Sequence, residues 1–461
     1  MKKIIVYKTC LTLAILLLTN ACEDFLEAGE PFNEISQEQI FNDEVTAQAA
    51  VTSIYAHIRD AGVLNGGLFG LSILEGLYAD ELVSYATPGQ PLDNFYTHTI
   101  VPSNGAVLDI WKSSYKTIYM ANAVLESLEN SPQLTLESRN RLKGECLFLR
   151  GVIHFYLVNL FGEVPYITGT DFETNSTVSR VDTTTIYQNS VQDLQEAKNL
   201  LTDTYPSAYR TRANRYVVAA FLARVHLYMH NWGLAEVESS IVLENTVIFQ
   251  LEQELSNEFL KESTSTIWHL APRNLGENTY EANNLILSQG PPPNFTLNPE
   301  LLASMETIDL RRSIWIGEVS NGTDTWYYPF KYRHRGNTGT TMEYSVMLRL
   351  SEQYLIRAEA RAMQDNLEGA KSDLNVVRQR SGLNNTEATT KQGIIEAIAL
   401  ERRHELFTEH GHRWFDIRRT GQADAILSQI KPNWDLSNLL LPIPESEILM
   451  NGNLLPQNPG Y

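Results

Sequence analysis

Residues 399–419 read ALERRHELFTEHGHRWFDIRR, and this stretch does most to decide the fold. Leu400, His404 and Phe407 recur at an approximately helical spacing, which favours an amphipathic helix. Gly411 then stands where a helix C-cap is expected. We therefore predict a helix that ends at Gly411, followed by a compact segment rich in aromatic and charged side chains.

The charged residues of this stretch allow two interpretations. In the first, residues 413–419 form a buried corner in which arginines and an aspartate neutralise one another around aromatic rings, because ionisable groups are seldom buried unless paired. In the second, the histidines and acids form a catalytic or zinc-binding set. His404 and Glu405 are similar to the start of a zinc-protease helix, but the next histidine, His410, falls on a different helical face. We favour the buried corner.

Four stretches spread along the chain carry a resemblance to a known family. They are GECLFLRGVIHFYLVNLFGEVPYI (144–167), YLIRAEARAMQDNLEGAKSDLNVVRQRSGL (354–383), RRHELFTEHGHRWFDIRR (402–419) and LLLPIPESEILMNGNLLPQNPGY (439–461). The chain resembles the SusD/RagB family of surface nutrient-binding lipoproteins. The resemblance implies an all-α-dominated, SusD-like fold, in which a tetratricopeptide-like scaffold of helical hairpins carries an irregular, loop-rich ligand-binding region.

The spacing of apolar residues agrees with such a scaffold. It predicts helical hairpins within about 109–162, 183–244 and 348–419, with small alanines at close-packing positions in the last of these. Helical periodicity is absent over about 63–105, before the first hairpin, and over about 246–345, between the second and the third. Gly and Pro are frequent in both segments. Long irregular stretches inside a folded chain usually carry a function. We expect these two segments to form the ligand face of one SusD-like domain, residues 22–461.

The N-terminus predicts a secreted and lipid-anchored protein. Lys2 and Lys3 precede a short apolar run, which is the pattern of a signal peptide over residues 1–21. Ala21 precedes Cys22, so we expect cleavage there and lipidation of Cys22; a plain cleaved signal peptide is the alternative. The acidic residues that follow resemble the start of this family, which implies an outer-membrane protein facing the cell exterior.

Composition excludes several classes of function. The chain of 461 residues has a formal net charge of -19, which argues against nucleic acid as a partner. The same charge disfavours a strongly anionic ligand unless a local basic pocket exists. The sequence contains no GxSxG, glycine-rich phosphate loop, HExxH or CxxC motif. We therefore predict a protein that is not an enzyme and has neither a cofactor nor a bound metal.

Residues for sugar binding are expected in the irregular segments, because sugar rings pack on aromatic faces and their hydroxyls need polar partners. The two segments are rich in such residues, and Arg273, Asn278 and Asn283 are among them. Trp315 and Trp326 border regularly patterned pieces, so we interpret both as structural. The candidate ligand residues are Asp80, Tyr85, Tyr96, Trp268, Tyr280 and Arg335.

The resemblance implies a function in nutrient uptake. The protein is expected to capture an oligosaccharide and deliver it to a SusC-type TonB-dependent transporter, over which it lies like a lid. One alternative is a peptide-binding, RagB-like lid of a peptide importer, which would rely on backbone hydrogen bonds more than on stacking. A surface-anchored glycan hydrolase is the less favoured alternative.

Lipid anchoring can be tested at Cys22. We expect the wild-type protein to incorporate labelled palmitate, because the thiol is the acylation site. The Cys22→Ser variant should incorporate none and should be released from the membrane fraction, whereas a Cys146→Ser control should label normally. Labelling of the Cys22→Ser variant at the wild-type level would contradict the anchor.

Overall fold

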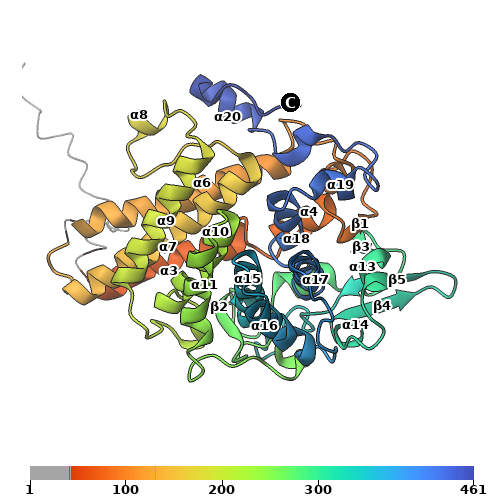
Figure 1. Cartoon of the computed structure of the whole chain (residues 1–461). Coiled ribbons are helices and arrows are strands. Elements are labelled where there is room, and N and C mark those ends of the chain that lie inside the picture. Colours follow the sequence, from red (N-terminus) through yellow and green to blue (C-terminus); the bar gives the residue numbers. More distant parts are fainter. Residues whose placement is uncertain (1–40, 42, 130) are drawn as a thin grey trace, which may run out of the picture.

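The computed structural model describes residue 41 and residues 43–129 and 131–461 (Figure 1). The leader at 1–21 and the lipidation site at Cys22 lie outside the described residues. Within the described chain, helices dominate and the strands form three two-stranded sheets. The all-α-dominated fold class is thereby confirmed.

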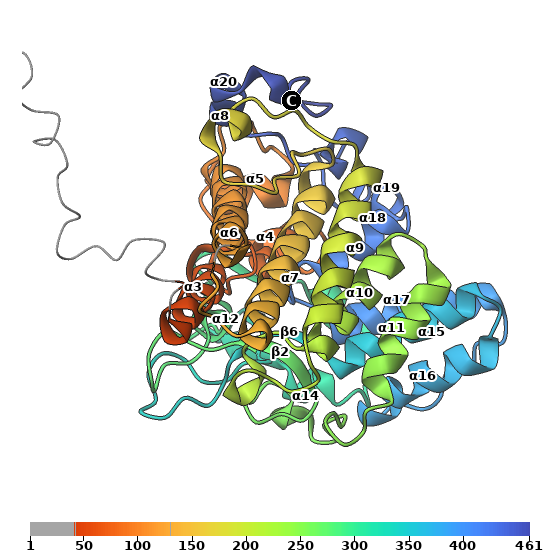
Figure 2. The same cartoon turned by 90° about the vertical axis from the view of Figure 1, so that its left-hand side faces the viewer.

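The scaffold is a row of helices, each packed against the next. Figure 2 shows them in succession across the molecule. Their bounds are α3 (Glu44–Ala61), α6 (Gly105–Glu129), α7 (Leu136–Phe161), α9 (Thr183–Leu200), α10 (Arg215–Tyr228), α11 (Trp232–Leu243), α15 (Leu350–Met363), α16 (Leu367–Arg380) and α17 (Lys391–Glu405). Apart from α3 and the first turn of α6, these helices lie within the three segments predicted from apolar periodicity.

Helix α7 lies at the centre of this row, and two glycines let α9 approach it closely. A Cβ atom on Gly151 would lie 3.0 Å from Leu194 Cγ, and one on Gly144 would lie 2.8 Å from Leu201 Cγ. Thr135 caps the start of α7, because its side chain accepts a hydrogen bond from the backbone N–H of Ser138. Most of the following residues are buried, which makes α7 the core helix of the scaffold.

Buried arginine forks tie neighbouring helices together. Arg150 of α7 donates two hydrogen bonds of 2.6 and 2.7 Å to Asp193 of α9. Arg224 of α10 likewise donates bonds of 2.6 and 2.7 Å to Glu352 of α15. Bidentate pairs of this kind fix orientation as well as distance. The helix–helix angles are therefore set by polar contacts as well as by apolar packing.

The two irregular segments fold into short elements on one side of the scaffold (Figure 1). The N-terminal segment contributes α4 (Leu71–Tyr78), β1 (Leu82–Ser84) and α5 (Pro91–Thr97). The later segment contributes β2 (Thr266–Leu270), α12 (Tyr280–Leu285), β3 (Phe295–Leu297), α13 (Pro299–Ser304), α14 (Arg311–Ile314), β4 (Ile316–Ser320), β5 (Thr325–Pro329) and β6 (Ser345–Arg349). The C-terminal part adds α18 (His412–Arg419), α19 (Ala423–Leu427) and α20 (Glu445–Met450), and α8 (Phe172–Asn175) lies between α7 and α9.

All three sheets are antiparallel, and two of them join distant parts of the chain. Strand β1 pairs with β3 so that Leu82 lies opposite Leu297. Strand β2 pairs with β6, with Leu270 opposite Ser345. Strands β4 and β5 form a local hairpin. The pairing of β1 with β3 brings the two irregular segments onto a common face.

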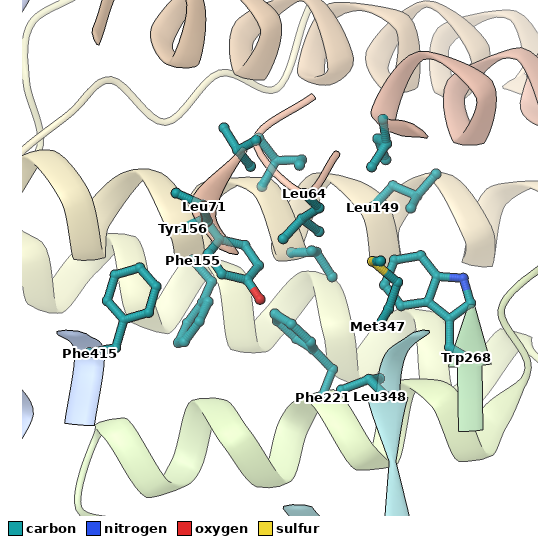
Figure 3. Packing of buried hydrophobic residues seen from close by; sticks show 14 of the residues in the cluster. Leu64, Leu71, Leu149, Phe155, Tyr156, Phe221, Trp268, Met347, Leu348 and Phe415 are labelled. Atoms are coloured by element: carbon teal, nitrogen blue, oxygen red, sulfur yellow. The ribbon is translucent and has the colours of Figure 1, made fainter. Parts of the chain in front are cut away.

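The apolar core lies between the scaffold and this face. Figure 3 shows Phe155, Phe221, Trp268, Met347 and Leu348 packed together from α7, α10 and the β2–β6 sheet. The Trp268 ring makes an edge contact with Phe148, with their centroids 5.2 Å apart. The core therefore anchors the β2–β6 sheet, and with it the loops at its ends, to the helices.

A buried ionic cluster joins residues from six separate parts of the chain. Its members are Glu258, Asp309, Arg311, Lys331, Arg349, Arg380, Glu401, Glu405 and Glu409. Glu405 is fully buried and accepts hydrogen bonds from Arg311 (2.9 Å), Arg380 (2.5 Å) and Arg349. Glu409 accepts from Arg349 (2.8 and 2.9 Å) and from Lys331 (2.5 Å). In the predicted corner itself, Asp416 accepts hydrogen bonds from Arg402 (2.7 Å) and Arg419 (2.8 Å), as the first interpretation of the signature stretch expects, whereas Arg413 pairs with Asp80 outside the stretch (2.6 Å).

The protonation of this cluster follows from its geometry. Burial by itself opposes ionisation of Glu405, but Arg380, Arg349 and Arg311 outweigh it and hold the pKa of Glu405 well below its ordinary value. Burial lowers the pKa of Lys331 to about 8, although the neighbouring Glu409 acts in the opposite direction. The carboxylate at the centre is therefore ionised and depends on its arginines.

Several predicted boundaries need correction. Helix α17 ends at Glu405, and Gly411 is the N-cap of α18 with a positive φ of 76°, so it begins a helix instead of ending one. The tight turns between these helices let Glu405 and Glu409 both face the ionic cluster. The irregular segment 63–105 contains the helices α4 and α5, and β6 occupies 345–349 before α15 begins.

Among the described residues, α7 alone has the length and apolar composition to cross a membrane. Its apolar window is completely buried inside the fold, which is the situation of a core helix.

The ionic cluster makes Glu405 a sensitive position for stability. Replacing it by glutamine leaves three buried guanidinium groups facing a neutral side chain. We expect Glu405→Gln to lower the free energy of unfolding by about 3–5 kcal/mol, as breaking a buried ion pair does. Urea denaturation followed by far-UV circular dichroism measures the change.

The matched control is Glu368→Gln on the exposed face of α16, where Glu368 pairs only with Lys371. We expect a change below about 0.5 kcal/mol there. Equal effects of the two substitutions would show that the buried cluster does not carry the stability assigned to it.

Candidate functional site

A hollow rich in aromatic side chains opens where the two irregular segments meet. We call it the aromatic pocket; it encloses about 470 Å³. It is lined by Val83, Tyr85, Thr296, Pro299, Asp324, Thr325, Trp326 and Tyr327. The β1–β3 pairing and the β4–β5 hairpin position these residues, so the pocket exists only in the folded chain.

Hydrogen bonds and close packing fix the rings of the aromatic pocket. The indole N–H of Trp326 donates to the Tyr85 hydroxyl at 3.0 Å. Gly290 lies against the Trp326 ring so closely that a Cβ atom would come within 2.0 Å of Cζ3. Any side chain at Gly290 would therefore displace the indole. Tyr85 itself is 44% exposed, which leaves its ring available to a ligand.

This arrangement suits a flat, hydroxylated ligand. The exposed Tyr85 ring offers a surface on which the C–H face of a sugar can stack. Asp324, exposed at the turn of the hairpin, offers a carboxylate that can accept hydrogen bonds from hydroxyl groups. A pocket with apolar walls and a few polar groups is the usual form of a small-molecule site.

A second hollow, the polar cleft, lies between the C-terminal end of α3 and the loops around 272–283 and 336–337. It encloses about 230 Å³ and is lined chiefly by Arg59, Arg273, Asn274, Tyr280, Asn283 and Asn337. Buried Asn278 holds the two loops together, because its amide donates to the Gly336 carbonyl (3.2 Å) and accepts from the backbone N–H of Met342 (2.8 Å). The cleft is therefore a fixed feature of the loop region.

Three of the six candidate ligand residues are open to solvent or line a hollow. Tyr85 lines the aromatic pocket, and Tyr280 is half-buried in the polar cleft. Arg335 is exposed on the segment that leads into the cleft. The structure brings Tyr280 and Arg335 to the same part of the loop face and places Tyr85 in the separate aromatic pocket.

Two of the candidates are structural, and their assignment as ligand residues is wrong. Asp80 is buried and forms ion pairs with Arg403 (2.8 Å) and Arg413 (2.6 Å). Burial opposes ionisation of Asp80, but Arg413 and Arg403 outweigh it and hold its pKa below the ordinary value. Trp268 is 1% exposed, and its ring lies in the apolar core (Figure 3).

Tyr96, the sixth candidate, is half-buried with a cation beneath its ring. Lys431 Nζ lies 3.7 Å from the ring centroid and donates a hydrogen bond to the Leu77 carbonyl. Burial lowers the pKa of Lys431 to about 7. At least one face of Tyr96 is therefore used within the protein.

The sequence interpretation missed Trp326, Arg59 and Asp60. Trp326 was expected to be structural, yet it also lines the aromatic pocket. The signal that could have revealed it is the aromatic run Trp326-Tyr327-Tyr328 next to a turn. Nothing in the pattern of α3 singles out Arg59 or Asp60, because only the fold brings the end of that helix to the 272–283 loop.

The histidines of the signature stretch lie in structural positions. His404 is buried 2.9 Å from the Ser304 hydroxyl, and burial lowers its pKa to about 3. The His410 ring contacts the Val346 carbonyl at 2.8 Å, and burial lowers its pKa as well. In the described part of the chain, no group of three or more His, Cys, Asp or Glu residues is arranged to hold a metal ion.

Two protein-family models match the chain. The model described as "Starch-binding associating with outer membrane" matches residues 24–227, and the model described as "SusD family" matches residues 316–461. Together the two matches cover more than half of the chain, including the signature stretch and both partners of the β4–β5 hairpin.

Curated relatives are similar over their whole length. The chain is 26% identical to SusD-like protein P2 of Formosa agariphila, over 98% of this chain and 99% of that protein. It is 25% identical to SusD-like protein P25 of the same organism, over 96% of this chain and 97% of that protein.

Solved structures share the fold. A SusD superfamily protein from Bacteroides vulgatus superposes with a TM-score of 0.80 at 21% identity, covering 91% of this chain and 99% of that one. A laminarin-binding SusD-like protein superposes with a TM-score of 0.74 at 25% identity, covering 91% of this chain and all of the other.

Proposed function

This chain belongs to the SusD/RagB family, and we propose that it is a cell-surface lipoprotein that captures oligosaccharides and delivers them to a SusC-type TonB-dependent transporter. The family binds carbohydrate and is associated with the outer membrane. The observation that carries the proposal is the aromatic pocket, in which an exposed tyrosine and a fixed indole edge lie beside a carboxylate. The laminarin-binding neighbour supports a glycan as the ligand.

The mechanism we propose is capture by shape and stacking. The Tyr85 ring packs on a sugar face while the Trp326 hydrogen bond holds the tyrosine hydroxyl in place. Because the rings are already fixed, binding costs little ordering entropy. The ligand leaves unchanged, since capture needs no bond to be made or broken.

Delivery to a transporter requires a surface for the partner, and the helical scaffold offers one. An apolar groove of about 660 Å³ lies between α6, α8 and α20, at the end of the molecule opposite α14 in Figure 2. Phe172 at its edge is 81% exposed, and Leu449 and Met450 of α20 are exposed beside it. Exposed apolar side chains gathered in one place mark contact surfaces for other proteins. We propose that this groove contacts the transporter.

The glycan site is tested by Tyr85→Ala. We expect retention on neutral glycans, with laminarin in the panel, to weaken about three- to tenfold, because one stacking surface is lost. Affinity gel electrophoresis of the mature protein measures the change. Tyr119→Ala removes a similarly exposed tyrosine from α6 and should leave retention unchanged.

Three other outcomes would contradict the aromatic pocket as the ligand site or the glycan as the ligand. Unchanged retention of the Tyr85→Ala protein would remove the aromatic pocket from ligand binding. Selective retention of peptides would favour the RagB-like importer, and turnover of a polymer by the purified protein would favour a hydrolase.

The transporter surface is tested by Phe172→Asp. A carboxylate in an apolar contact loses hydration when the partners meet, so we expect the variant to recover much less transporter in co-purification from outer membranes. Glycan retention should stay at the wild-type level. Val247→Asp, an equally exposed apolar position after α11, is the control; equal losses in the two variants would rule out a specific role for the groove.

A further inference from the structure

The polar cleft has no role in the glycan capture described above, yet its lining is highly organised. Beside the cleft, Asp60 at the end of α3 accepts two hydrogen bonds of 2.7 Å from the lining residue Arg59. The same carboxylate forms a 3.0 Å ion pair with Arg273 of the facing loop. One aspartate thus holds two guanidinium groups that line the cleft.

Both arginines have N–H donors that Asp60 does not use. Arg59 uses Nε and one terminal nitrogen on Asp60, and its other terminal nitrogen makes only a 3.5 Å contact with the Ala271 carbonyl. Arg273 reaches Asp60 through one terminal nitrogen, and its side chain is 57% exposed. A guanidinium has five N–H donors, so each arginine can still bind an acceptor from a ligand.

Two asparagines add donors whose orientation is fixed by the backbone. The Asn283 side-chain oxygen accepts from the N–H of Gly336 at 2.7 Å, and that of Asn337 accepts from the N–H of Gly339 at 2.8 Å. Because a backbone N–H can only donate, each amide must turn its oxygen toward it. The two amino groups are left without a partner in the described structure.

The acceptors in the same place are largely occupied. The Asp60 carboxylate binds the two arginines, and the Glu277 carboxylate accepts from the backbone and side-chain nitrogens of Asn274 (3.2 and 2.9 Å). The cleft therefore has more available hydrogen-bond donors than acceptors. It complements a ligand group that can only accept hydrogen bonds.

The ionisable side chains near the cleft also favour an anionic ligand group. Arg59 and Arg273 balance Asp60 and Glu277, and exposed Arg335, one residue before Gly336, adds a further cation. Behind the cleft, Glu281 accepts a hydrogen bond from Ser345, and burial raises its pKa to about 7. In a chain of net charge -19, this is a local site at which an anionic group can be tolerated.

We propose that the polar cleft is a second ligand subsite that binds an oxyanion carried by a sugar, either the carboxylate of a uronic acid or a sulfate ester. The inference rests on the proposed glycan-binding function and extends it to the charge of the ligand. Arg59 and Arg273 bind the oxyanion through charge-assisted hydrogen bonds, and the amino groups of Asn283 and Asn337 complete its coordination.

The test compares three probes in isothermal titration calorimetry: oligogalacturonate for the carboxylate, sulfated carrageenan oligosaccharide for the sulfate ester, and laminarin oligosaccharide as the neutral case. We expect one anionic probe to bind more tightly than laminarin. Arg273→Gln should weaken that probe about tenfold, because charge-assisted hydrogen bonds are lost, and should leave laminarin unchanged.

Asn283→Asp is a second variant that keeps the local structure. Its carboxylate can still accept from the Gly336 N–H, but an oxygen replaces the amino donor, so an oxyanion is repelled. We expect a loss at least as large as that of Arg273→Gln. Arg215→Gln, which removes an exposed arginine paired with Asp203 away from the cleft, should change nothing.

Each result bears on the proposal. Selective weakening of one anionic probe supports it and identifies the oxyanion. Equal or tighter binding of laminarin by the wild-type protein overturns it, as does equal weakening of all probes in both variants. Failure of every glycan to bind the wild-type protein overturns the proposed function and this inference together, whereas laminarin binding alone overturns only the inference.

Discussion

The structure depends on a buried carboxylate that cannot be left without partners. Glu405 is removed from solvent, and an isolated charge in that position would cost several kcal/mol. Three arginines from different parts of the chain, Arg311, Arg349 and Arg380, compensate it. Arg311 comes from the loop region, Arg349 from the end of β6, and Arg380 from the end of α16. Satisfying one charge therefore requires the C-terminal helices, the repeats and the loops to be in place together.

This requirement explains how a loop-rich face can hold a fixed shape. Lys331 lies two residues after β5 and pairs with Glu409, so the strand that carries Trp326 is linked to the ionic cluster. Strand β2 is held from the other side by Trp268 in the apolar core. The aromatic pocket and the polar cleft lie on segments anchored in this way, which allows binding without reordering of the loops.

The charged residues of the chain divide into two groups with different roles. The buried arginines Arg311, Arg349 and Arg380 bind carboxylates inside the protein and are closed to solvent. Arg273, by contrast, is exposed and keeps free donors, and Arg335 is exposed nearby. A net charge of -19 therefore describes the surface as a whole and does not describe the cleft, where a few exposed donors gather.

The sequence by itself determined the long helices, because apolar periodicity is a local property: α7 and α16 lie within the predicted segments 109–162 and 348–419. It also determined the family resemblance through contiguous motifs, and Tyr85 as an exposed aromatic residue in a loop. Only the tertiary structure decided that Asp80, five residues earlier, is a buried ion-pair partner, because Arg403 and Arg413 lie more than three hundred residues away along the chain. The same holds for Trp268, which the core encloses, and for Arg59, which the fold brings to the polar cleft. Burial and partnership are set by long-range contacts, and no local pattern records them.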